Sequence, residues 1–281
     1  MTPGDSLWRL TWHRFRRSKL ATFALVYVAL ATLIALFAPF LASSPNTIDL
    51  GSRLLPPGEG HYFGTDDLGR DVLARMIHGA RVSLTVGFFA TFIAVLVGSF
   101  LGAMAGYYGG AADWLVSRVI EVVLCFPFLF LLLGIVALFR PSMLTIMIAL
   151  GLTSWTNEAR YVRGEFLRIR DVEFALAARA SGARDARIIF RHLLPNALAP
   201  MLVSASFGVA SAILTESALS FLGLGVPLPT ASWGSILSTA HEHIEYAWWL
   251  VLFPGLAIFT TVAAFNIVGE RVREALDPHS E

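Results

Sequence analysis

The sequence predicts an all-α integral membrane protein with about six transmembrane helices. Of its 281 residues, 56% are apolar and 15% are charged, and the mean hydropathy is +0.67. Soluble domains carry a smaller apolar share and a larger charged share. Long apolar runs also recur along the chain, so that spans and their connections account for nearly all of its length. The composition leaves no room for a soluble catalytic domain, and we predict no catalytic residues.

Six apolar runs are long enough, or nearly so, to cross about 30 Å of hydrocarbon. The first follows basic residues, as in a secretory signal, but it exceeds the roughly 7 to 15 apolar residues of a signal, so we interpret it as an uncleaved span. The fourth is short unless its helix continues past Glu158, and the fifth is interrupted by Glu216. The runs cover residues 20–42, 82–107, 119–139, 143–157, 196–222 and 246–269.

Basic residues predict the orientation, because Lys and Arg in short flanking loops are retained in the cytoplasm. Residues 1–19 carry five basic residues and the connection after the fourth run carries eight arginines, whereas the last outer loop, 225–245, carries none. Arginines in the loop after the first run disagree with this scheme, although acidic residues offset them. We therefore predict both termini in the cytoplasm. The predicted organisation is a cytoplasmic segment 1–19, a first span 20–42, an extracytoplasmic loop with an interfacial helix 43–81, a five-helix core 82–269 that includes a cytoplasmic loop 158–195, and a cytoplasmic tail 270–281.

Small residues form a stripe along the second run. Ala94, Gly98, Gly102 and Gly106 recur every four residues, which places them on one face of a helix and allows another backbone to approach closely. The alternative is the ordinary scatter of glycine in membrane helices. We predict a packing face, whose partner is either a neighbouring span or another subunit.

Charged residues inside apolar runs are costly and tend to face a cavity or a partner. Arg118 and Glu121 are three residues apart and can pair with each other. Glu216 has no cation nearby in sequence, only hydroxyl residues such as Ser220. Glu216 and Ser220 are therefore our candidates for a translocation path, with a structural carboxyl group as the alternative.

No cofactor or metal site is predicted. Cys125 is the single cysteine, so neither a disulfide nor a cysteine-based metal site can form. His241 and His243 flank Glu242 in the last outer loop, but alternate residues share a face only in a strand. Lys19, the only lysine, does not follow a glycine, so the phosphate-binding G-x4-G-K-[ST] loop is absent. The arginines lie in short separate segments, which also argues against nucleic acid as a partner.

The segment before the second run predicts a turn and a helix outside the membrane. Gly64 and Thr65 suggest the turn, and a helix is expected to begin at Asp66 or Asp67. Asp67 would then pair with Arg70 and Asp71 would lie on the same face. Two alternatives stay open, a self-satisfied surface helix and a contact with a binding protein.

Residues 158–192 form an arginine-rich amphipathic stretch that we expect to form helices at the cytoplasmic face. Within it Ala177 and Ala178 precede Gly182, and nine residues later the chain reads His192-Leu-Leu-Pro195. This spacing resembles the EAA loop, A-A-x3-G-x9-x-x-L-P, of the permeases of ATP-binding cassette importers.

The resemblance implies a coupling helix that rests on an ATPase subunit and transmits its closure as a rigid-body motion. Leu176 stands where the motif has Glu, so no ion pair is implied at that position. The alternative is a surface helix or a lipid-headgroup anchor. The residues implied to couple to the ATPase are Ala177, Ala178, Gly182, Arg184, Leu194 and Pro195.

Three further segments resemble the dipeptide, oligopeptide and nickel branch of these permeases: HYFGTDDLGRDVLARMIHGARVSL (61–84), ALSFLGLGVPLPTASWG (218–234) and NIVGERVREALDP (266–278). The resemblance implies a non-enzymatic translocation subunit of a bacterial cytoplasmic (inner) membrane that imports di- or oligopeptides, with nickel or another small solute as alternatives. It implies a second permease, two ATPases that carry ATP and Mg, and an extracytoplasmic binding protein. An ion-coupled secondary transporter is less favoured, because no internal repeat is visible.

Overall fold

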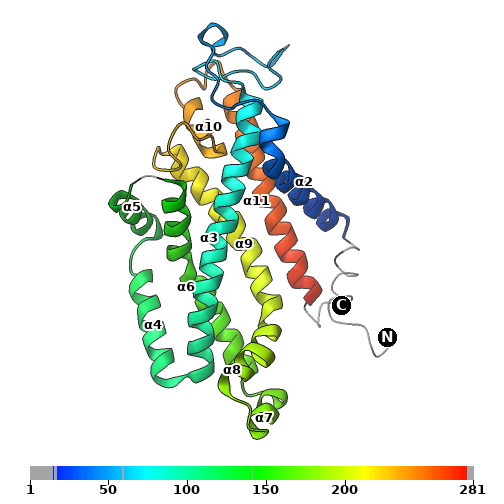
Figure 1. Ribbon diagram of the computed structural model, residues 1–281, viewed down its shortest axis with the longest axis vertical. Coiled ribbons are helices and arrows are strands. Elements are labelled where there is room, and N and C mark those ends of the chain that lie inside the picture. The colour runs from blue at the N-terminus through cyan, green and yellow to red at the C-terminus, as the bar shows by residue number, and fades with distance from the viewer. Residues whose placement is uncertain (1–14, 16–17, 59, 141, 277–281) are drawn as a thin grey trace.

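A computed structural model describes residue 15 and residues 18–58, 60–140 and 142–276. Within these residues the regular elements are helices and no strand occurs, which confirms the predicted all-α class (Figure 1). The predicted segment 1–19 lies mostly, and the tail 270–281 partly, outside the described residues. The main elements are α2 (Lys19–Leu41), α3 (Val72–Tyr108), α4 (Gly110–Leu124), α5 (Phe128–Leu138), α6 (Met143–Ile169), α7 (Glu173–Ala180), α8 (Asp185–Arg187), a π-helical turn (Ile188–Leu193), α9 (Leu194–Phe221), α10 (Trp233–Ala240) and α11 (Trp249–Leu276).

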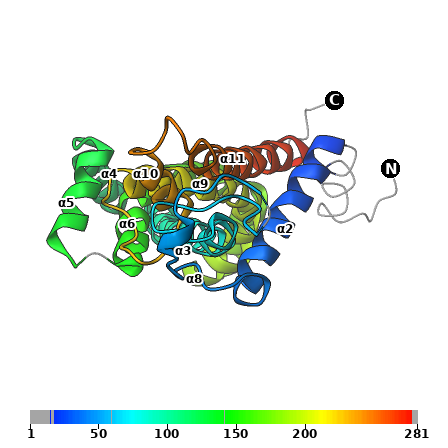
Figure 2. The same cartoon turned by 90° about the horizontal axis from the view of Figure 1, so that it is seen from above.

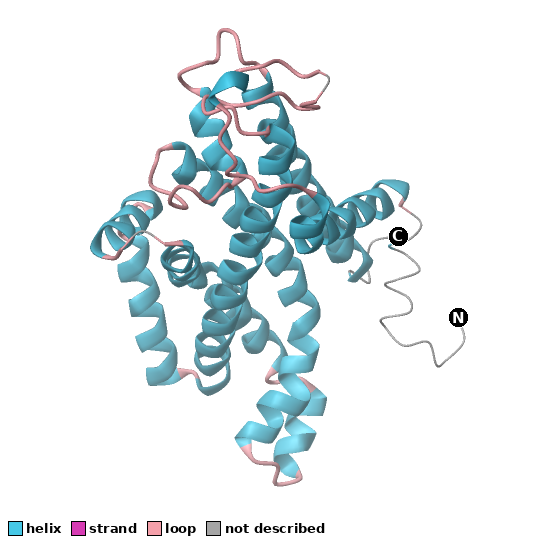
Figure 3. Ribbon diagram, turned by 45° about the horizontal axis from the view of Figure 1, so that its top comes forward, coloured by secondary structure: helices cyan, strands magenta, loops and turns pink. Residues whose placement is uncertain are grey.

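The helices form an elongated bundle around α3. Viewed along its long axis (Figure 2), α3 lies between α4 and α5 on one side and α2 and α11 on the other. Long loops gather at the end of the bundle where α3 begins, whereas short turns connect the helices at the opposite end, which holds α7 and α8 (Figure 1 and Figure 3). We call these the loop end and the tip.

In the described part, four helical stretches are long and apolar enough to cross a membrane: α2, α3, Asp185–Phe221 and α11. The pair α4 and α5 together makes a fifth, although it is bent by 87°. The α6 helix has 27 residues, but its second half is charged. The chain is thus a multi-pass membrane protein with four or five apolar spans.

The third predicted span, residues 119–139, is not one straight helix. The α4 helix starts earlier, at Gly110, and ends at Leu124, and a second helix, α5, begins at Phe128. Pro127 lies at the break: it lacks a backbone N–H and disfavours helical conformation in the residue before it. The fourth helix, in contrast, continues past Glu158 to Ile169, the condition under which it was expected to be long enough.

The expected helix start at Asp66 or Asp67 was also wrong. The α3 helix begins at Val72, and the Asp71 carboxylate caps it by accepting a hydrogen bond from the Ala74 N–H at 2.8 Å. The Asp66 carboxylate accepts from the N–H groups of Leu68 and Arg70, a local turn that competes with a helix. From Val72 the helix runs unbroken for 37 residues, so the interfacial helix and the second span are one element.

A buried ion cluster stabilises the loop end. The Asp66 carboxylate accepts hydrogen bonds from Arg70 Nε at 2.7 Å and Arg75 Nη1 at 2.6 Å, and Asp66 and Arg75 are almost fully buried. Asp67 lies 3.5 Å from Arg70, whereas Asp71 lies 2.8 Å from His61. The expected single face of Asp67, Arg70 and Asp71 is therefore replaced by two separate clusters.

The predicted stripe of small residues on α3 faces α6. A Cβ atom added to Gly98 would lie 2.6 Å from the Cβ of Glu158, and one added to Gly106 would lie 2.6 Å from the Cβ of Phe166. At Gly102 the added atom would meet the carbonyl oxygen of Ala159 even more closely. The two backbones approach this closely only because the stripe lacks side chains. Its partner is a helix of the same chain.

Candidate functional site

The tip consists of two short helices joined by a glycine turn. At the end of α7 the Gly182 N–H donates to the Arg179 carbonyl at 2.9 Å and the Ala183 N–H donates to the Ala178 carbonyl at 3.1 Å. These bonds form a Schellman motif, which requires a left-handed residue at the position of Gly182, where φ is +77°. The glycine of the sequence pattern thus has a local structural reason.

One face of the tip is buried and the other is open. Ala175, Ile188 and Leu193 are fully buried and pack with Phe166 at the end of α6. The opposite face exposes Leu176 at 48%. Of the residues implied to couple to an ATPase, the exposed ones are Ala177, Gly182, Arg184 and Pro195, whereas Ala178 and Leu194 are half-buried against the core.

Polar contacts attach the tip to the end of α3. The Tyr107 hydroxyl donates to the Asp185 carboxylate at 2.7 Å, and the Arg179 guanidinium lies over the Tyr107 ring, 5.2 Å from its centroid. Arg170 donates to the Gly106 carbonyl at 3.0 Å. The sequence interpretation missed these residues, since the contacts join positions that are far apart in the chain. Tyr107 therefore connects the tip to the helix that crosses the whole molecule.

Replacing Tyr107 by phenylalanine is expected to loosen the tip. The change removes a hydrogen bond to the exposed carboxylate of Asp185, for which we expect a loss of about 1 kcal/mol in local stability. Amide hydrogen exchange of residues 173–187 should rise about fivefold. Tyr108→Phe is the matched control, because Tyr108 is exposed and no hydrogen bond of its hydroxyl is found in the described part. Equal exchange in both variants would contradict the role of Tyr107.

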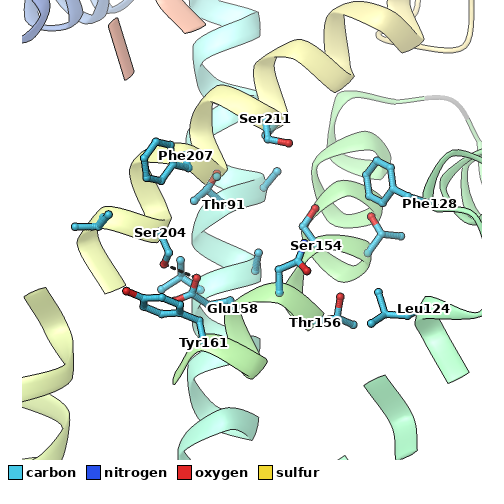
Figure 4. Close-up of a pocket in the computed structure, with 18 of the residues that line it drawn as sticks. Thr91, Leu124, Phe128, Ser154, Thr156, Glu158, Tyr161, Ser204, Phe207 and Ser211 are labelled. Carbon is cyan, nitrogen blue, oxygen red and sulfur yellow. Dashed lines mark hydrogen bonds between the residues drawn. The ribbon is translucent and has the colours of Figure 1, made fainter. Parts of the chain in front are cut away.

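A cavity of about 670 Å³ lies between α3, α6 and α9, with residues of α4, α5 and α11 at its edge. Its wall includes apolar side chains such as Phe128 and Phe207 together with hydroxyl groups (Figure 4). Glu158 lines it and is only 6% exposed. The Glu158 Oε2 atom accepts a hydrogen bond from the Ser204 hydroxyl at 2.6 Å, drawn as a dashed line in Figure 4. The sequence interpretation treated Glu158 only as the boundary of the fourth span. A carboxylate within a span whose helix continues beyond it is, however, a pattern that marks functional sites.

Glu216 and Ser220, the residues predicted to line a path, lie outside this cavity. Glu216 is fully buried and accepts hydrogen bonds from the hydroxyls of Ser220 at 2.7 Å and Ser83 at 3.1 Å. Ser83 also accepts from the Trp233 N–H at 3.3 Å, and Ser220 from the Val226 N–H at 3.2 Å. In this structure the Glu216 carboxylate joins α9 to α3 and to the start of α10.

The remaining charged groups singled out in the sequence are on the surface. Arg118 and Glu121 form the expected ion pair, and both are more than half exposed. The His243 ring nitrogen lies 3.0 Å from the Tyr246 hydroxyl, and the His241 ring packs edge-on against Phe221. Among the residues that the structure describes, no group of three His, Cys, Asp or Glu side chains converges.

Two protein-family models match this chain. The model of the family described as binding-protein-dependent transport system inner membrane component matches residues 98–281. The model of the N-terminal TM domain of oligopeptide transport permease C matches residues 6–57.

Two curated relatives align over nearly the whole chain. The dipeptide transport system permease protein DppC of Alkalihalophilus pseudofirmus is 44% identical over 97% of this chain and 90% of its own length. The oligopeptide transport system permease protein OppC of Bacillus subtilis is 39% identical over the same shares. Among solved structures, an inward-facing MetNI methionine ABC transporter aligns with a TM-score of 0.61 at 19% identity, covering 73% of this chain and 98% of that chain. The last similarity concerns the fold alone.

Proposed function

Because the chain belongs to the family of binding-protein-dependent transport system inner membrane components, the permease subunits of ATP-binding cassette importers, we propose that it moves di- or oligopeptides into the cytoplasm. The observation that carries this proposal is the alignment of dipeptide and oligopeptide permeases over 97% of the chain. Subunits of this family are not themselves catalysts. The energy would come from separate ATPases that bind ATP and Mg.

The proposed topology has six spans with both termini in the cytoplasm. The bent pair of α4 and α5 would count as the third span and α6 as the fourth. Arginines concentrated at the tip support a cytoplasmic location for α7 and α8. The loop end, with residues 43–71, would then face the extracytoplasmic side, where a substrate-binding protein delivers its ligand.

We also propose that the tip docks on an ATPase subunit. The support is the exposed small surface of Ala177 and Gly182, the apolar side chain of Leu176 beside it, and the attachment of the tip to α3 through Tyr107. Leu176, which stands in place of the motif's glutamate, would make an apolar contact with the ATPase. In the complete importer a second related permease and two ATPases would accompany this chain in the bacterial cytoplasmic (inner) membrane.

Gly182→Trp is expected to prevent docking. No atom of the described residues lies within 4 Å of a Cβ added at Gly182, so an indole there projects into the open space that an ATPase would occupy. Misfit of this kind costs about 1 to 3 kcal/mol, and we expect co-purification of the ATPases with the permease to fall about tenfold or more.

Gly223→Trp is the matched control. Gly223 also has a φ of +77°, ends α9 with the same pair of Schellman hydrogen bonds and has open space around it, but it lies at the other end of α9. Both variants therefore carry the same backbone strain. If Gly182→Trp and Gly223→Trp retain the ATPases equally, the docking proposal fails. If peptide uptake continues when the ATPases are inactivated, an ion-coupled transporter becomes the better explanation.

A further inference from the structure

The wall of the cavity holds a carboxylate with one oxygen unpaired. Glu158 Oε2 accepts the hydrogen bond from Ser204, but Glu158 Oε1 is buried and has no hydrogen-bond partner in the described part of the chain. Leaving such a group unsatisfied is costly, and more so for a charge. Such groups are few in native structures, and each calls for an explanation such as a functional role or a bound partner.

A second polar atom on the same wall is also unsatisfied. The Thr91 hydroxyl oxygen on α3 is buried without a hydrogen-bond partner among the described residues, and Thr91 lines the cavity with Glu158. Figure 4 shows that the two side chains belong to different helices, Thr91 to α3 and Glu158 to α6. The cavity thus offers acceptor atoms that no described residue engages.

Neighbouring residues fix the Glu158 side chain. Gly98 of α3 approaches the Cβ of Glu158 closely, and Ser204 of α9 holds one carboxylate oxygen. Three helices therefore determine where the free oxygen lies. In the part of the chain that the structure describes, no cation forms an ion pair with Glu158, and the charged residue that shares the cavity wall is Arg273 of α11.

The volume of the cavity and the oxygen atoms of its wall favour a small organic cation as its ligand. Its volume of about 670 Å³ is within the range of about 300 to 1,000 Å³ that holds small molecules. A divalent metal ion would need more carboxylate or histidine ligands than Glu158 supplies. An ammonium group carries three hydrogen-bond donors and needs only nearby oxygen acceptors.

We propose that Glu158, held by Ser204, is a subsite for the α-ammonium group of the transported peptide within the permease itself. The proposal rests on the proposed function as a peptide importer. Hydroxyl-bearing residues such as Thr91 line the same cavity, and Arg273 on its wall carries the charge opposite to that of Glu158, as a zwitterionic peptide needs.

The test measures binding of Ala-Ala and of N-acetyl-Ala-Ala to the complex of both permeases and both ATPases without the binding protein. Wild type should bind Ala-Ala about tenfold or more tightly than the acetylated peptide, because acetylation removes the ammonium charge. Glu158→Gln, which keeps the shape and removes the charge, should bind both peptides equally weakly. Glu121→Gln is the control, because Glu121 is an exposed carboxylate outside the cavity.

Two results overturn the subsite: wild type that binds the two peptides alike, or Glu158→Gln that retains the preference for Ala-Ala. The first needs no variant, so the test holds even if Glu158→Gln fails to assemble. Failure of the proposed function looks different. In that case the complete wild-type importer with its binding protein, reconstituted in liposomes, shows no ATP-dependent uptake of Ala-Ala.

Discussion

Replacing Gly102 by leucine is expected to abolish stable folding of the permease. The Cβ atom alone would meet the Ala159 carbonyl oxygen and would lie 3.0 Å from the Arg163 nitrogen, both of them backbone atoms of α6 that cannot move aside singly. Accommodating leucine requires the two central helices to separate along their length. Overpacking typically costs about 1 to 3 kcal/mol, and contact with rigid backbone places this change at or beyond the upper end.

The measurement is the yield of monodisperse protein in detergent and its thermal unfolding temperature. Gly164→Leu on α6 is the control, because an added Cβ at Gly164 has no atom within 4 Å in the part of the chain that the structure describes. Both substitutions remove a helical glycine, so the gain in helix propensity is the same. We expect the control to keep wild-type yield. A Gly102→Leu protein that is as stable as Gly164→Leu would show that the close approach of α3 and α6 is dispensable.

Removing the carboxylate of Asp66 should destabilise the loop end by about 3 to 5 kcal/mol, the usual cost of breaking a buried ion pair from one side. In Asp66→Ala the guanidinium of Arg75 loses the one partner that it has in the described part, and Arg75 is completely buried. Arg70 loses its closest partner and, among the residues that the structure describes, keeps Asp67 as its one ion-pair partner, at 3.5 Å. The guanidinium groups of Arg70 and Arg75 would then lie close together in a buried site.

Thermal unfolding together with protease sensitivity of residues 43–71 measures this effect. Asp67→Ala is the neighbouring control: the Asp67 side chain is 31% exposed, and exposed ion pairs contribute about 0 to 1 kcal/mol. If the two alanine variants unfold at the same temperature, the buried cluster does not hold the loop end. A double variant, Asp66→Ala with Arg75→Met, should recover part of the loss, because it removes one of the stranded charges.

Long apolar runs made the helical class and most spans predictable. Composition and run length identify helices well in a membrane, because the backbone must satisfy its hydrogen bonds internally there. The break within the third span was not predicted, because hydropathy outweighed the information in Pro127, whose effect on the backbone is independent of how apolar its neighbours are. The start of α3 was misplaced because an aspartate before a helix can be a cap or a turn residue, and only the tertiary contacts of Asp66 decide between them.

The site residues divide in the same way. The tip could be predicted because its residues are close in sequence and follow a spacing, and the glycine turn is a local structure. Glu158 could not be ranked above Glu216, since the role proposed for it depends on Ser204, 46 residues away, and on the cavity that three helices form. The attachment of Tyr107 to Asp185 likewise spans 78 residues and leaves no local pattern.

The unbroken course of α3 has a mechanical consequence. At about 1.5 Å per residue its 37 residues extend for about 55 Å, well beyond about 30 Å of hydrocarbon. Near the start of the helix Arg75 donates a hydrogen bond to Asp66, and near its end Tyr107 donates one to Asp185 of the tip. No proline interrupts the helix, and it continues from Val72 to Tyr108 as one element. If an ATPase docks on the tip as proposed, its movement of the tip would be transmitted along α3 as a rigid body to the loop end.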